Sequence, residues 1–123
     1  GDGAGLVTDM AEFARTLWIE ARPMVVVQAT EAVEAAQAWA ATGDSASWRR
    51  LEERSHQLAG SLGSYAAAMR PRDGVDAGAA EPSATDRAAA AALELDATVH
   101  EAEPDAARIV AATQRLLAAV KLT

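Results

Sequence analysis

The sequence has no cysteine, few aromatic residues and no long apolar run. The absence of cysteine excludes disulfides, thiolate zinc sites, iron–sulfur clusters and cysteine nucleophiles. No apolar run approaches the roughly 20 residues that cross a membrane, and the first segment, GDGAG, lacks the charged and apolar regions of a signal peptide. We therefore expect a cytoplasmic protein that does not enter a membrane.

Positive charge is also scarce, because 11 lysines and arginines are set against 18 aspartates and glutamates and leave a formal net charge of −7. DNA, RNA and anionic membranes bind proteins through clustered positive charge. The composition therefore argues against all three as partners.

Hydrophobic residues make up 50% of the chain, much of it alanine, whereas aromatic residues make up only 4%. Alanine is the strongest helix former, while β-sheet cores favour aromatic and β-branched residues. A chain of 123 residues is long enough for one compact domain. We expect a single all-α domain over residues 8–123, preceded by a disordered segment over residues 1–7.

The first part of this domain has apolar residues at the three- and four-residue spacing of amphipathic helices. Thr8 or Asp9 can cap a first helix, and Pro23 either kinks it or starts a second one, which ends at a turn formed by Gly43 and Asp44. The apolar stripe predicted for this part consists of Met10, Phe13, Leu17, Ala21, Val26, Ala29, Val33, Ala36 and Ala40.

The remaining segments predict three more helices. One begins near Ser45 or Ser47, one runs from Thr85 or Asp86 to about Glu101, and the last starts at residues 103–105. Residues 70–86, rich in Pro, Gly and Asp without an apolar period, predict a long mobile loop. Together the segments predict an antiparallel four-helix bundle with an additional N-terminal helix. The stripes are Leu51, Ser55, Leu58, Leu62, Tyr65 and Met69 in the first of these helices and Ile109, Thr113, Leu116 and Val120 in the last.

His56 lies opposite the apolar stripe of its helix. Each helical residue advances about 100°, which places the large apolar residues of this helix roughly 120° to 200° from His56. The imidazole should therefore face solvent. The same arithmetic places Gly60 about 40° and Gly63 about 20° from His56, one and two turns further along.

Two glycines on this face require a reason, because each costs a helix roughly 0.8 to 1 kcal/mol relative to alanine. Without side chains beside it, the imidazole of His56 stays open to another protein. A neutral imidazole is nucleophilic near physiological pH and can carry a phosphoryl group on nitrogen. The pattern thus indicates a phosphoacceptor histidine.

The stretch HQLAGSLGSY, which begins at His56, resembles the H-x-L-[KA]-G-S-x-x-G motif of histidine-containing phosphotransfer (HPt) domains. Leu17-Trp18, Arg22-Pro23 and the turn at residues 43–44 are similar to the N-terminal half of that family, so the resemblance covers roughly residues 10–69.

The resemblance implies that His56 is phosphorylated, that Gly60 gives the ring room, and that the bundle has no kinase or phosphatase activity. It also implies a response-regulator receiver domain or a hybrid histidine kinase as partner, no cofactor, and a monomer. Many family members have a lysine one or three residues after the histidine, where this chain has Gln57 and Ala59. Local positive charge must then come from Arg49, on nearly the same face two turns earlier, and from Arg54, two residues away. Glu52 and Glu53 on the preceding turn oppose this charge.

Other interpretations are weaker or less specific. A degenerate HPt-like bundle could bind a receiver without being phosphorylated, and the missing lysines keep this alternative open. His100, near several carboxylates, lacks a second histidine and so gives little support for a metal site. An interpretation as a helical enzyme has little support, because the sequence offers no nucleophile-and-base pair or metal cluster. We expect Trp18, Trp39, Trp48 and Tyr65 to be packing residues.

Overall fold

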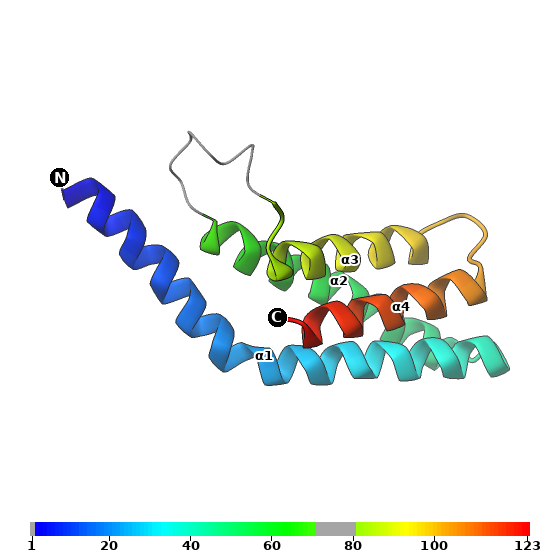
Figure 1. The fold of residues 1–123 in the computed structure, drawn as a ribbon. Helices are drawn as coiled ribbons and strands as arrows, with labels where there is room; N and C mark the ends of the chain where they lie inside the picture. The colour runs from blue at the N-terminus through cyan, green and yellow to red at the C-terminus, as the bar shows by residue number, and fades with distance from the viewer. Residues whose placement is uncertain (1, 71–80) are drawn as a thin grey trace.

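The computed structural model describes residues 2–70 and 81–123, with side chains described from residue 10 onward. Within these ranges it is all helical and contains no strand, which confirms the predicted all-α class (Figure 1). No helix in the described ranges combines the length and the apolar character needed to cross a lipid bilayer. The four helices are α1 (Asp2–Thr42), α2 (Ser45–Met69), α3 (Ala84–Val99) and α4 (Ala106–Lys121).

The helices pack in a ring, with α1 against α2, α2 against α3, α3 against α4, and α4 against α1. In the described residues, no Cα atoms of the diagonal pairs, α1 with α3 and α2 with α4, lie within 8 Å of each other. Alanine and leucine fill the centre, and the alanines of α1 and α3 allow close approach of the backbones. The largest fully buried side chains are Leu51, Leu58, Leu62, Leu95, Ile109, Leu116 and Val120.

The turn between α1 and α2 forms at the predicted residues. Gly43 adopts a φ of 69°, the left-handed conformation that glycine accepts most readily, and its N–H donates to the carbonyl of Trp39 at 2.7 Å. Asp44 caps α2 by accepting hydrogen bonds from the backbone N–H groups of Ala46 and Ser47. Such a short connection makes α1 and α2 antiparallel neighbours.

Helix α1 differs from the prediction at its N-terminal end. It begins at Asp2, whereas we expected residues 1–7 to be disordered and the helix to start at Thr8 or Asp9. It also continues through Pro23, so the expected additional N-terminal helix is the first half of α1. Figure 1 shows a bend between the blue and cyan parts of α1, and the blue part leans away from the bundle. A proline inside a helix removes one hydrogen bond and crowds the preceding turn, which bends the helix.

The predicted apolar stripe of this first half is wrong. Met10, Phe13 and Leu17 are 57%, 64% and 39% exposed, respectively. The neighbouring residues Ala11, Ala14 and Trp18 are buried instead. The buried face is thus rotated by one residue, about 100°, from the stripe of large side chains.

Trp18 anchors this buried face, because its ring lies against Tyr65 of α2 with ring centroids 5.3 Å apart. Trp39 and Trp48 pair in the same way across the α1–α2 turn, at 4.6 Å. These three tryptophans and Tyr65 belong to the core or pack against it, which confirms their predicted packing role.

Helices α2 and α4 follow their predicted stripes closely. In α2 the residues from Leu51 to Leu62 of the stripe are fully buried, and in α4 all four stripe residues are buried. Helix α3 begins at Ala84, capped by Ser83 rather than by Thr85 or Asp86. Asp86 instead completes a capping box with Ser83. Of the predicted loop at 70–86, residues 71–80 lie outside the described residues.

Candidate functional site

His56 lies in the middle of α2, and its side chain is 85% exposed. The preceding residue, Ser55, and the apolar residue Leu58 are both fully buried on the other side of the helix. Packing of that buried face fixes the rotation of α2 in the bundle, so the imidazole is held facing solvent. The predicted orientation of His56 is confirmed.

Gly60 and Gly63 leave open space on the same helix. A Cβ atom built at either glycine meets no neighbouring atom within 4 Å. Neither glycine is therefore required for close packing inside the protein. The clearing beside His56 is a property of the outer surface, where the carbonyl of Gly60 accepts a hydrogen bond from Ser64 Oγ at 3.0 Å.

Arg54 does not supply free positive charge to His56. Its Nε and Nη2 atoms donate to Glu31 Oε2 of α1 at 3.1 and 3.0 Å, and its Nη1 donates to Gln57 Oε1 at 3.2 Å. Its side chain is thus committed to the α1–α2 seam, and the amide of Gln57 is occupied by the same interaction. This pairing argues against the predicted role of Arg54 in the phosphoryl environment, and it depends on how α1 packs against α2.

Arg49 can take part in the predicted docking surface around His56, whereas Ala59 cannot. Arg49 is exposed and makes no ion pair with any residue in the described ranges. Ala59 is buried in the core with 8% exposure. Contrary to our prediction, its side chain therefore does not line a docking surface. The reason is its position on α2, on the edge that packs in the core beside Ser55 and Leu62.

Asp96 of α3 is the site residue that sequence reasoning missed. Its Oδ2 atom lies 4.0 Å from His56 Nδ1, and its side chain is 25% exposed. Ser55 Oγ of α2 lies 3.4 Å from Asp96 Oδ1. Only the packing of α2 against α3 brings Asp96 to His56, because the two residues are 40 positions apart in the sequence.

His100 approaches the same carboxylate from the end of α3. Its Nδ1 atom lies 3.4 Å from Asp96 Oδ1 and 2.7 Å from the Asp96 backbone carbonyl oxygen. The spacing of four residues between Asp96 and His100 places both on one helix face and was visible in the sequence. Asp96 is therefore shared between two histidines, one from α2 and one from α3.

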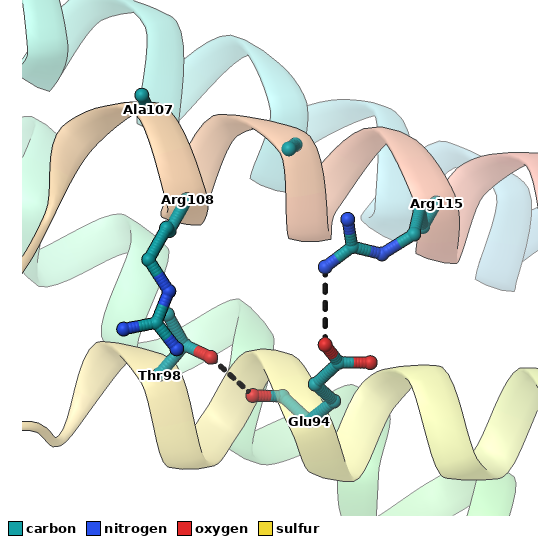
Figure 2. A pocket seen from close by; sticks show the side chains of 6 residues that line it. Glu94, Thr98, Ala107, Arg108 and Arg115 are labelled. Atoms are coloured by element: carbon teal, nitrogen blue, oxygen red, sulfur yellow. Dashed lines mark hydrogen bonds and ion pairs between the residues drawn. The ribbon is translucent and has the colours of Figure 1, made fainter.

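A separate shallow hollow of about 320 Å³ lies between α3 and α4 (Figure 2). Arg115 crosses it to Glu94 at 3.1 Å, and Arg108 pairs with Glu101 at 3.2 Å. Its charges are thus internally balanced. No group of three or more histidine and carboxylate side chains suited to a metal ion occurs in residues 10–70 and 81–123.

No protein-family model, no curated protein and no solved structure matches this chain. The functional interpretation therefore depends on the chemistry of the residues around His56.

Proposed function

We propose that this chain is an HPt domain in which His56 carries a phosphoryl group to or from an aspartate of a receiver domain. The observation that carries the proposal is the 85% exposed imidazole beside two helical glycines that have open space around them. Helical glycines lower stability, so their position beside an exposed nucleophile favours a role in partner access. The ring of four helices supports an HPt-like bundle over residues 8–123.

The proposed reaction is a direct transfer. A nitrogen lone pair of neutral His56 attacks the phosphorus of the receiver's aspartyl phosphate, the P–O bond to the aspartate breaks, and the carboxylate leaves with the bonding electrons. The product is a phosphoramidate on His56, and the reverse reaction returns the group to an aspartate. This chemistry requires no cofactor from the bundle, and the partner is a receiver domain or a hybrid histidine kinase. We propose that the protein acts as a cytoplasmic monomer.

A second candidate is a bundle that binds a receiver without accepting phosphate. The electrostatics of the site favour it, because Arg54 is paired with Glu31 and the Asp96 carboxylate lies 4.0 Å from the His56 ring. A phosphoryl group on His56 would then gain little neutralisation from nearby side chains. Arg49, which lies two turns before His56 on nearly the same face, is better placed for that purpose than Arg50, which lies about 120° around the helix from His56.

The two candidates are separated by incubating the protein with phosphorylated receiver domains from the same genome. We expect mass spectrometry to detect one phosphoryl group on His56 that is labile in acid and stable in alkali. The variant His56→Gln should keep the fold and lose the label. His100→Gln removes the other histidine and should still be labelled on His56, although its contact with Asp96 makes it no control for the labelling rate.

Label that persists in His56→Gln would show that the acceptor is a different residue. Receiver binding by the wild type without any label would support the interaction module instead.

A further inference from the structure

We propose that Asp96 is a positioning residue for His56: its carboxylate accepts a hydrogen bond from Nδ1–H and leaves Nε2 as the nucleophilic nitrogen. This inference rests on the proposed phosphotransfer function and assigns the reacting atom within it. Nothing in the sequence around His56 indicates which nitrogen reacts.

The two oxygens of Asp96 have different surroundings. Oδ1 is approached by Ser55 Oγ and by His100 Nδ1, each at 3.4 Å. Oδ2 is the oxygen nearest to His56, at 4.0 Å from Nδ1. These contacts are made by Oδ1, so Oδ2 remains as the carboxylate oxygen available to the imidazole.

The 4.0 Å between Asp96 Oδ2 and His56 Nδ1 is within reach of a small rotation of the His56 side chain. A hydrogen bond between nitrogen and oxygen has a typical length of about 2.7 to 3.2 Å, so the pair must close by roughly 1 Å. His56 is 85% exposed and can rotate about its side-chain bonds without disturbing the core, whereas Asp96 is 25% exposed. The histidine therefore moves to the carboxylate.

The hydrogen bond fixes the tautomer of the ring. A proton on Nδ1 that is donated to Asp96 leaves the lone pair on Nε2, the other ring nitrogen, free to attack an approaching phosphoryl group. As the Nε2–P bond forms and the P–O bond of the aspartyl phosphate breaks, the receiver carboxylate leaves with the electron pair. The ring becomes an imidazolium, and its positive charge then lies beside the negative charge of Asp96, as an orienting carboxylate provides in other histidine-dependent reactions.

The test uses the full chain with Asp96→Asn, which keeps the size of the side chain and removes its charge. Glu94→Gln is the matched control, since it removes the same charge from α3 at a residue that pairs with Arg115. Nitrogen-15 NMR of the His56 ring reports the tautomer, and the initial rate of labelling by a phosphorylated receiver reports the reaction. Phosphoramidate serves as a second, partner-free phosphoryl donor.

We expect His56 of the wild type to carry its proton mainly on Nδ1, although exposed histidines in water favour the other tautomer. Asp96→Asn should remove this preference and slow labelling about fivefold, the effect of a mostly exposed charged pair. Asp96→Glu should recover part of both properties, and Glu94→Gln should change neither.

The proposal is overturned if Asp96→Asn leaves the tautomer unchanged, even where labelling slows because the protein is less stable. It is also overturned if the tautomer changes while both donors label His56 at the wild-type rate. A wild type that neither donor labels would contradict the proposed function. The NMR comparison would still decide in that case whether Asp96 orients the ring.

Discussion

Replacing Gly60 should raise stability and lower function at the same time. Glycine in a helix is less stable than alanine by roughly 0.8 to 1 kcal/mol, and a Cβ at position 60 meets nothing within 4 Å. No steric cost therefore opposes the gain, and Gly60→Ala should raise the free energy of unfolding by nearly this full amount. Gly60→Gln should gain almost as much, since glutamine is also a good helix former. For a domain of this size the melting temperature should rise by roughly 3 to 5 °C.

The two variants should differ in phosphotransfer. A single methyl group at position 60 adds little bulk beside His56, so Gly60→Ala should be labelled at close to the wild-type rate. The longer side chain of Gly60→Gln lies about 40° around the helix from His56 and one turn away, where it obstructs a partner. Displacing the donor phosphate from its reactive position should slow labelling roughly tenfold or more.

Denaturant unfolding and the initial labelling rate, measured on the same preparations, test this pair. Core damage lowers stability and function together, so it cannot produce the expected opposite changes. If Gly60→Gln is stabilised and is labelled as fast as the wild type, the glycine does not clear a docking surface. If Gly60→Ala is less stable than the wild type, the space around position 60 is not open.

The sequence predicted best those helices whose buried face consists of large side chains. In α2 and α4 the stripes of leucine, isoleucine and valine recur at helical spacing, and burial follows them closely. The turn at Gly43 and the cap at Asp44 were also predictable, because left-handed backbone and capping both favour particular residue types.

The first half of α1 was predicted poorly because its buried face, apart from Trp18, is made of alanine. Ala11 and Ala14 do not stand out as apolar beside Met10 and Phe13, yet their small size suits close packing. The large residues remain on the outside, where Met10 and Phe13 are more than half exposed. A stripe that weights residues by hydrophobicity alone therefore selects the wrong face.

The candidate site was predictable only where it is local to one helix. The exposure of His56 and the clearing at Gly60 follow from helical geometry alone. The contacts of Asp96 with His56 and of Arg54 with Glu31 join different helices, and their register depends on how the whole bundle packs. For this reason the sequence could show Arg54 two residues from His56 without revealing that its charge is paired with Glu31 of another helix.

The last two predictions test α1 and the cap of α3 by thermal unfolding. Phe13→Ser should change stability by less than about 0.5 kcal/mol because Phe13 is exposed, whereas Trp18→Ala should cost about 3 kcal/mol or more; equal losses would contradict the observed face. At Asp86, partial burial raises the pKa, but hydrogen bonds from Ser83 and Arg70 outweigh this and hold the pKa below its usual 3.8. A carboxyl whose pKa is lowered by folding stabilises the protein above its unfolded pKa, and this contribution is lost as the pH falls through the folded pKa. The melting temperature should therefore decrease as the pH is lowered below about 4. The decrease should be less steep in Asp86→Asn, which has no carboxyl to protonate at this position. The same slope in both proteins would mean that the capping box does not favour the charged form of Asp86.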